Sequence, residues 1–295
     1  YPKEGMPLWD KYSTHAVAHT IEVYSRYTFQ YPYPVAYSVL GGLRGGMEYP
    51  MICFNGPRPL DDGTYPERTK FALIGVVIHE VGHNYFPMIV NSDERQWTWM
   101  DEGLNSFVQF LAQEEWQKDY PQSRADRGLT DYMRRTDRVP VMSNSESIAE
   151  LGNNSYAQPT IALNLLREHI LGRELFDHAF KTYAQRWMFK RPTPADFFRT
   201  MEDASGVDLD WFWRGWFYST DRVDVAIDQV QWLQLDSRDP AVENPKAKAE
   251  KDALPTTLTR ERNAALPKRI DRFPELKDFY DSFEKASVLP RAKKK

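Results

Sequence analysis

The chain has 295 residues, of which 41% are hydrophobic and 14% are aromatic, so it can bury a large core and most of it is expected to fold. With a formal net charge of −4 and no long basic stripe, the sequence excludes nucleic acid as an expected partner. Cys53 is the single cysteine, so no internal disulfide is possible. The longest apolar run, residues 71–78, is much shorter than the roughly 20 residues that cross a bilayer, and the sequence predicts no transmembrane segment.

The first 220 residues are dominated by patterns typical of helices. Apolar residues recur at helical spacing, or form a segment too long for an ordinary strand, in residues 12–27, 70–85, 100–117 and 159–171. Further helices are expected at residues 173–189, at 194–204 with Thr193 as N-cap, and at 209–218. Short extended segments are expected at residues 35–40 and 47–54, beside two glycine pairs. The sequence thus predicts an α+β fold that is mostly α-helical, with a small sheet near the N-terminus.

The composition changes after residue 220. At residues 223–235 the period of the apolar residues shifts towards two, which is typical of a strand. From residue 239 the chain is rich in Pro, Lys, Glu and Ala, and residues 241–295 hold 14 Lys and Arg against 9 Asp and Glu. We therefore expect a main domain at residues 1–220, the start of a further β segment or domain at 221–238, and a charged tail with little regular structure at 239–295.

The motif His79-Glu80-Val81-Gly82-His83 lies within the apolar segment 70–85, which we interpret as a buried helix. At about 3.6 residues per turn its two histidines lie on one face, one turn apart, so both imidazoles can reach one metal ion. The alternative is two core histidines with a chance glutamate. Burying two imidazoles and a carboxylate without a shared partner costs several kcal/mol, however, and we predict that His79 and His83 bind zinc.

A catalytic zinc usually has three protein ligands and a water in its fourth position, so a third ligand must come from another part of the chain. Glu102, at the start of the next predicted helix, is the best candidate. An acidic residue at the N-terminus of a helix is also favoured by the helix dipole, which alone would explain Glu102 or its neighbour Asp101.

The chemistry of a zinc site assigns two further roles. Zinc lowers the pKa of a bound water to about 7, and a neighbouring carboxylate can accept the proton as the water attacks a carbonyl carbon. Glu80 follows His79 directly and so cannot point along the line of the two histidines, which leaves it to act as the general base. The tetrahedral intermediate needs a hydrogen-bond donor for its oxyanion besides the metal, and Tyr156 is our candidate.

The chain resembles the aminopeptidase N family of zinc metallopeptidases, which are gluzincins, through three motifs in the same order. These are Gly45-Gly46-Met47-Glu48-Tyr49, the His79–His83 motif followed after 18 residues by Glu102, and a later tyrosine. The resemblance covers roughly residues 8–235. It implies a two-lobed, thermolysin-like catalytic domain in which His79, His83 and Glu102 hold one zinc ion.

The resemblance also implies how substrate is bound. In this family the glutamate of the first motif binds the free amine of the peptide, a role that falls to Glu48. Its strand edge, with Gly45, Gly46 and Met47, would hold the peptide through main-chain hydrogen bonds.

The chain departs from the family pattern at several positions near these motifs. The departures are Tyr49 and Asp101, each in place of the usual Asn, residues 84–88 in place of Gln-Trp-Phe-Gly-Asn, and residues 157–159 after Tyr156 in place of a residue, Lys and Gly. For Tyr156 the alternative is an aromatic residue packed on the core at the entry of a helix. The family also carries a β-rich domain before the catalytic one, so we expect additional domains before residue 1.

We predict a zinc-dependent aminopeptidase that hydrolyses the N-terminal peptide bond of peptide substrates. Two alternatives remain open. A zinc endopeptidase with an open cleft would cleave N-acetylated peptides, and a catalytically silent peptide-binding homologue would bind zinc without hydrolysing any peptide. The chain begins at Tyr1 without an initiator Met, which favours an exported protein, periplasmic or extracellular.

Overall fold

The computed structural model describes residues 1–118, 120–121, 132–221 and 237–282. The chain divides into two compact units, the first formed by Tyr1–Thr220 together with Pro267–Lys295 and the second by Asp221–Leu266. The strand predicted at residues 223–235 lies outside the described residues. No helix among the described residues is long and apolar enough to cross a membrane.

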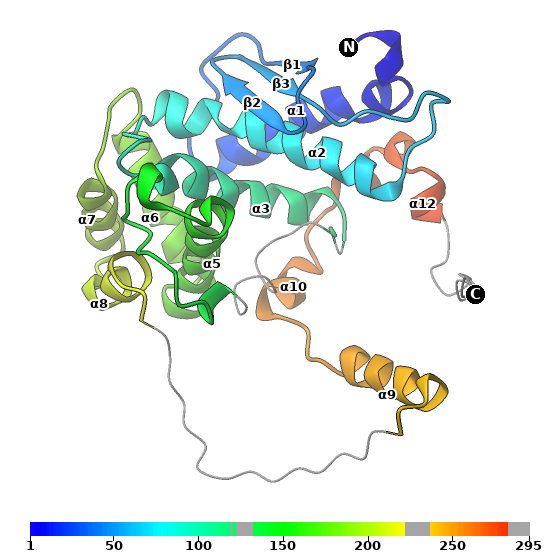
Figure 1. Ribbon diagram of the computed structural model, residues 1–295. Helices are drawn as coiled ribbons and strands as arrows, with labels where there is room; N and C mark the ends of the chain where they lie inside the picture. The colour runs from blue at the N-terminus through cyan, green and yellow to red at the C-terminus, as the bar shows by residue number, and fades with distance from the viewer. Residues whose placement is uncertain (119, 122–131, 222–236, 283–295) are drawn as a thin grey trace. The chain divides into compact units, whose positions relative to one another are not determined.

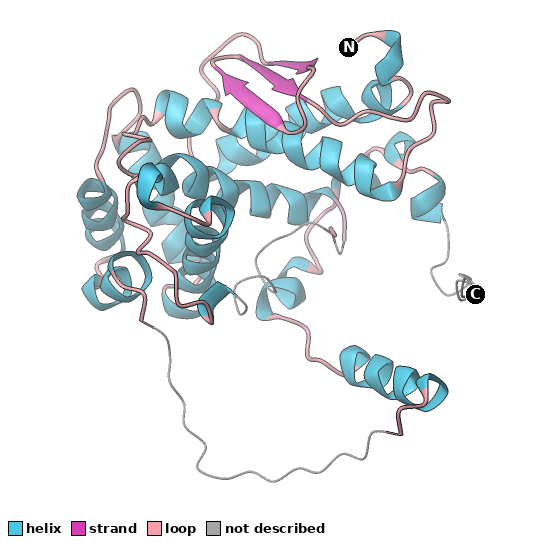
Figure 2. Ribbon diagram, viewed as in Figure 1, coloured by secondary structure: helices cyan, strands magenta, loops and turns pink. Residues whose placement is uncertain are grey.

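The helices of the first unit follow the sequence prediction closely. Their bounds are α1 (Leu8–Tyr27), α2 (Glu67–Gly82), α3 (Leu104–Trp116), α5 (Gln158–Leu165), α6 (Arg173–Arg186), α7 (Pro194–Ser205) and α8 (Asp210–Trp213). Thr193 caps α7 as predicted, in a capping box that it forms with Asp196. Together with one small sheet, these helices confirm a mostly helical α+β fold (Figure 2).

Several helices are extended by π-helical turns, which proteins often place at functional sites. These turns are Asn84–Ile89 after α2, Trp99–Gly103 before α3, Gly152–Ala157 before α5, Leu166–Ile170 after α5 and Arg214–Tyr218 after α8. Glu102 and Tyr156 each lie within such a turn, next to a regular helix that fixes the position of the backbone.

The sheet has three strands, β1 (Tyr37–Leu40), β2 (Gly46–Tyr49) and β3 (Ile52–Asn55), in the order β1-β3-β2. β1 pairs in parallel with β3, and β2 pairs with β3 in the antiparallel direction. β2 is therefore an edge strand, whose outer main-chain groups are open to an extended ligand.

The prediction of one extended segment at residues 47–54 is wrong, because the chain reverses within it. Tyr49 pairs with Ile52, and the two residues between them form a tight turn in which Met51 has a φ of 62°. Pro50 cannot donate to a strand ladder, which favours a turn at this position. The side-chain oxygen of Asn84, just after α2, accepts a hydrogen bond of 2.8 Å from the Met51 amide and ties the turn to that helix.

Helix α2 is the central element of the first unit. It packs against β2 and β3 on one side and against α1 and α3 on the other (Figure 1). Because it is covered on both sides, its apolar residues point in several directions and are fully buried, among them Leu73, Ile74, Val77 and Ile78. The motif at the C-terminal end of α2 is thereby held in a rigid environment.

The C-terminal region differs from the expected tail with little regular structure. The described part of residues 239–295 contains α9 (Pro240–Asp252) and α10 (Leu258–Asn263) in the second unit, and α11 (Arg269–Arg272) and α12 (Phe279–Ser282) in the first. The physical reason within the first unit is a set of ion pairs and one fully buried apolar residue, Leu276.

Lys70 of α2 anchors this C-terminal segment. Its side chain is only 1% exposed, and its Nζ lies 3.1 Å from Asp278 and 2.7 Å from Asp281. The hydroxyl groups of Tyr12 and Tyr65 also donate to Asp278, at 2.9 and 3.1 Å. An unpaired ammonium group would be strongly unfavourable in this position, so folding of α2 requires the segment to be docked.

Replacing Lys70 with Met should lower the free energy of unfolding by about 3 kcal/mol, because two largely buried carboxylates lose their cation. Urea unfolding followed by tryptophan fluorescence measures the loss. The control is Lys277→Met, which removes a well-exposed pair with Asp271 at 3.5 Å and should cost less than about 1 kcal/mol. Equal losses for the two variants would contradict the anchoring role of Lys70.

Candidate active site

The structure brings the three predicted metal ligands together. His79 lies in the last turn of α2 and His83 caps it, while Glu102 approaches from the turn before α3. The Nε2 atoms of the two histidines are 3.0 Å apart, and Glu102 Oε2 lies 3.1 Å from His79 Nε2 and 3.4 Å from His83 Nε2. Tetrahedral zinc with ligands at about 2.0–2.1 Å separates them by roughly 3.3 Å, so this spacing suits one zinc ion.

The charge around these atoms also fits a cation. Burial lowers the pKa of His83, but Asp101 and Glu102 outweigh this effect and raise it well above its ordinary value. For Glu80 burial acts in the opposite direction and raises the pKa to about 7. The Oε2 atom of Glu80 is buried and has no hydrogen-bond partner among the described residues. Two imidazoles and a carboxylate are a donor set that zinc prefers, and a divalent cation here would offset the repulsion among the acidic groups.

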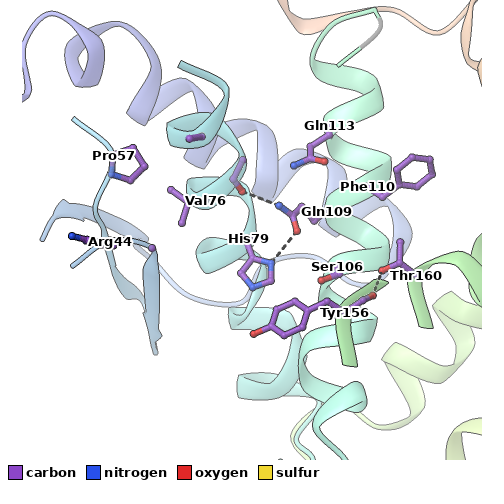
Figure 3. A pocket seen from close by; sticks show the side chains of 13 residues that line it. Arg44, Pro57, Val76, His79, Ser106, Gln109, Phe110, Gln113, Tyr156 and Thr160 are labelled. Atoms are coloured by element: carbon purple, nitrogen blue, oxygen red, sulfur yellow. Dashed lines mark hydrogen bonds between the residues drawn. The ribbon is translucent and has the colours of Figure 1, made fainter. Parts of the chain in front are cut away.

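Each imidazole is oriented by contacts of its Nδ1 atom, the nitrogen that does not face the metal position. His79 Nδ1 lies 2.9 Å from Gln109 Oε1, and the amide of Gln109 donates to the Gly75 carbonyl at 3.0 Å, which fixes the side-chain oxygen towards His79 (Figure 3). His83 Nδ1 lies 2.9 Å from the Phe86 carbonyl and 3.0 Å from Asp101. Oxygen acceptors at Nδ1 favour a proton on that nitrogen, so with a metal bound the lone pair of Nε2 would be free to coordinate it.

A buried hydrogen-bond network supports the helix at the same point. Asn105 donates from Nδ2 to the His79 carbonyl at 2.9 Å, and the Tyr24 hydroxyl lies 2.7 Å from Asn105 Oδ1. Gly82 makes room for this pair, because a Cβ atom there would lie 2.3 Å from both Tyr24 Oη and Asn105 Oδ1. Helix α1 is thereby linked through α3 to the backbone of the motif.

Strand β2 places the first motif beside the metal position. A carboxylate oxygen of Glu48 lies within 4.8 Å of ligand atoms of both His83 and Asp101. Gly46 lies directly against Glu80, since a Cβ atom at Gly46 would come within 2.1 Å of the Glu80 carboxylate. Met47 and Tyr49 are 42% and 52% exposed and alternate with the more buried Gly46 and Glu48, so β2 turns Glu48 towards the interior.

Tyr156 reaches the site from the turn before α5. Its ring stacks on His79 with centroids 5.9 Å apart and an interplanar angle of 20°. The close approach depends on Gly103, where a Cβ atom would lie 2.7 Å from Pro159 and 2.9 Å from the Ser155 carbonyl. Burial, followed by the nearby Glu102, raises the pKa of Tyr156, so its hydroxyl stays protonated and can donate a hydrogen bond.

A pocket of about 260 Å³ opens next to these groups (Figure 3). It lies between the start of β2 and the helices α2, α3 and α5. Its lining includes His79, Tyr156, Gln109, Val76, Phe110 and Arg44. The pocket therefore has the metal-binding edge on one side and a mixed polar and apolar wall on the other.

The orienting residues were not recognised from the sequence. Gln109 and Asn105 follow Glu102 by seven and three residues, so their place on the same helical face could have been predicted. For Asp101 the sequence suggests a helix-dipole role and a departure from the family pattern, but not its contact with His83. Tyr24 belongs to a distant helix, and nothing in its spacing indicates contact with Asn105.

Two histidines and a glutamate from adjacent helices, in a mostly helical fold with a small sheet, define the class of the gluzincins. The chain belongs to peptidase family M1, since residues 12–216 match the Peptidase family M1 domain. The family resemblance stated from the motifs is confirmed.

The chain is similar to aminopeptidases from distant organisms. It is 22% identical to aminopeptidase M1-B of Oryza sativa subsp. japonica over 266 residues, which cover 82% of this chain and 30% of that protein. It is 28% identical to glutamyl aminopeptidase of Homo sapiens over 144 residues, which cover 45% of this chain and 15% of that protein. The chain thus spans less than a third of the length of these relatives.

Solved structures show the same fold. The M1 zinc metallopeptidase E323A mutant from Deinococcus radiodurans has a TM-score of 0.56 at 18% identity, over 71% of this chain and 45% of that chain. The same mutant bound to a Tyr-Ser-Ala substrate has a TM-score of 0.54 at 19% identity, over 68% of this chain and 43% of that chain.

Replacing Gln109 with Leu should weaken zinc binding about 10–100-fold, because His79 loses the acceptor that fixes its tautomer and ring orientation. Competition with a chelator of known zinc affinity measures the change. Gln113→Leu is the matched control, since Gln113 lines the same pocket one turn further along α3 and makes no described contact with His79. A similar loss of affinity in both variants would rule out an orienting role for Gln109.

Proposed function

We propose that the chain is the catalytic part of a zinc aminopeptidase that removes N-terminal residues from peptides and holds one zinc ion at His79, His83 and Glu102. The observation that carries the proposal is the convergence of three ligand atoms within 3.0–3.4 Å of one another. Beside them lies a carboxylate oxygen of Glu80 that has no hydrogen-bond partner among the described residues. Membership of peptidase family M1 and similarity to named aminopeptidases support the same activity.

The residues divide the reaction between them. A bound zinc ion would polarise the substrate carbonyl and lower the pKa of a water to about 7. Glu80 accepts a proton from the attacking water, and its raised pKa near 7 suits a group that must then pass the proton to the leaving amine. The protonated hydroxyl of Tyr156 donates a hydrogen bond to the oxyanion as it develops.

Glu48 would give the enzyme its preference for free N-termini. A carboxylate beside the metal position attracts the ammonium group of a peptide and limits how far the peptide enters. The outer edge of β2 can pair with the peptide main chain and hold the first peptide bond at the metal position. The related Deinococcus radiodurans protein has been crystallised with a Tyr-Ser-Ala peptide, which supports peptides as the substrate class.

The proposal is tested with a panel of fluorogenic amino-acid amides, assayed with and without chelator. We expect hydrolysis that chelator abolishes and added zinc restores. Glu80→Gln should lower kcat by at least about 100-fold while zinc stoichiometry stays at one, because only the general base is lost. Glu67→Gln, at the opposite end of α2, is the matched control and should keep full activity. Zinc binding without hydrolysis of any substrate would instead favour a silent homologue.

Glu48→Ala tests the exopeptidase assignment. We expect kcat/KM for substrates with a free amine to fall about 10–100-fold, since the ammonium group loses a charged partner. The parent protein should cleave the N-acetylated forms of these substrates slowly, and the substitution should leave that rate unchanged. Equal loss on free and acetylated substrates would remove this role from Glu48, and efficient cleavage of acetylated peptides by the parent protein would favour an endopeptidase.

A further inference from the structure

The pocket beside His79 has an unusual distribution of charge. Its lining includes the neutral polar residues Gln109, Gln113 and Ser106 and the apolar residues Val76 and Phe110. Among the described residues that line it, Arg44 alone carries a full formal charge at neutral pH. The pocket is therefore suited to a ligand that carries one negative charge at its outer end.

The order of residues along strand β2 sets the direction in which a bound peptide would run. Glu48, which attracts the substrate amine in the proposed function, lies towards the C-terminal end of β2, and Arg44 lies just before its N-terminal end. Gly46 stands between them against the general base Glu80. A peptide whose amine lies at Glu48 and whose first peptide bond lies at Glu80 must continue towards Arg44. The pocket thus receives the part of the substrate that follows the cleaved bond.

The distance along the backbone from Gly46 to Arg44 determines which substrate residue lies near Arg44. Arg44 lies two residue steps before Gly46, a span of at most roughly 7 Å, and the peptide advances by about 3.3–3.6 Å per residue. A peptide that runs along β2 therefore brings its first or second residue after the cleaved bond beside the backbone of Arg44, within reach of the long side chain of this residue. A C-terminal carboxylate occurs there in a dipeptide or tripeptide, and an acidic side chain occurs there in a longer peptide.

Arg44 is available for such a contact. Its side chain is exposed, and it forms no hydrogen bond or ion pair with the residues that the structure describes. By contrast, the nearby Arg58 already donates to the main-chain carbonyls of Gly41 and Gly56. A guanidinium group presents paired N–H donors that match the two oxygens of a carboxylate.

We propose that Arg44 forms a carboxylate-binding subsite on the leaving-group side of the pocket. This inference rests on the proposed function for the direction of the substrate. The subsite selects peptides that carry a carboxylate one or two residues after the cleaved bond, which favours short peptides with a free C-terminus. The enzyme then acts on peptide fragments in preference to long chains.

The test measures binding and does not depend on turnover. The zinc-loaded Glu80→Gln protein is titrated calorimetrically with Leu-Ala-Ala and with its C-terminal amide. We expect the free acid to bind at least about fivefold more tightly, and Arg44→Gln to remove the difference while leaving the affinity for the amide unchanged. A second pair, Leu-Asp-Ala amide and Leu-Asn-Ala amide, separates an acidic side chain from a C-terminal carboxylate as the preferred source of the charge.

Arg68→Gln is the matched control, because Arg68 is an exposed cation in the first turn of α2 that does not line the pocket. It should preserve the preference for the acid. An acid-to-amide ratio that is the same with and without Arg44, or a failure of both peptides to bind, would overturn the subsite. Hydrolysis of amino-acid amides is measured separately on the parent protein, so a wrong subsite and a wrong activity give different results.

Discussion

The first unit depends on one electrostatic constraint: two imidazoles and several carboxylates share a largely buried space at the end of α2. Glu80, Asp101 and Glu102 all lie within this space, where burial disfavours their charged forms and their mutual repulsion adds to the cost. A divalent cation bound here would resolve the conflict, since it would pair with the carboxylates and with the lone pairs of His79 and His83 at once. Binding of the ion and folding of this region would therefore be thermodynamically linked.

The rest of the fold keeps these groups in place. Helix α2 is packed on opposite sides by the sheet and by α1 and α3, and it is further held by the C-terminal segment that docks on Lys70. Gly103 and Gly46 allow α5 and β2 to approach the metal position more closely than any side chain would permit. Rigid packing of this kind limits the movement of the side chains around the candidate site.

Local sequence patterns predicted the elements whose formation depends on residues close together in the chain. The apolar run of α2, the spacing of His79 and His83 and the cap at Thr193 all depend on residues within one helix. The turn at Pro50 and Met51 was missed because residues 47–54 look like one apolar strand without knowledge of pairing. The docked C-terminal segment was missed because its contacts join residues about 200 positions apart, although a lysine inside an apolar helix was a signal that a partner exists.

The close fit of Gly82 against Tyr24 and Asn105 couples residues that are far apart in the chain. A methyl group at position 82 fits only if the Tyr24 ring and the Asn105 side chain both move or become smaller. A larger residue at position 82 therefore requires accompanying changes at positions 24 and 105, which would loosen the core if they occurred alone. The residue at position 82 of the metal-binding motif and the residue at position 24 of α1 are therefore expected to covary among homologues.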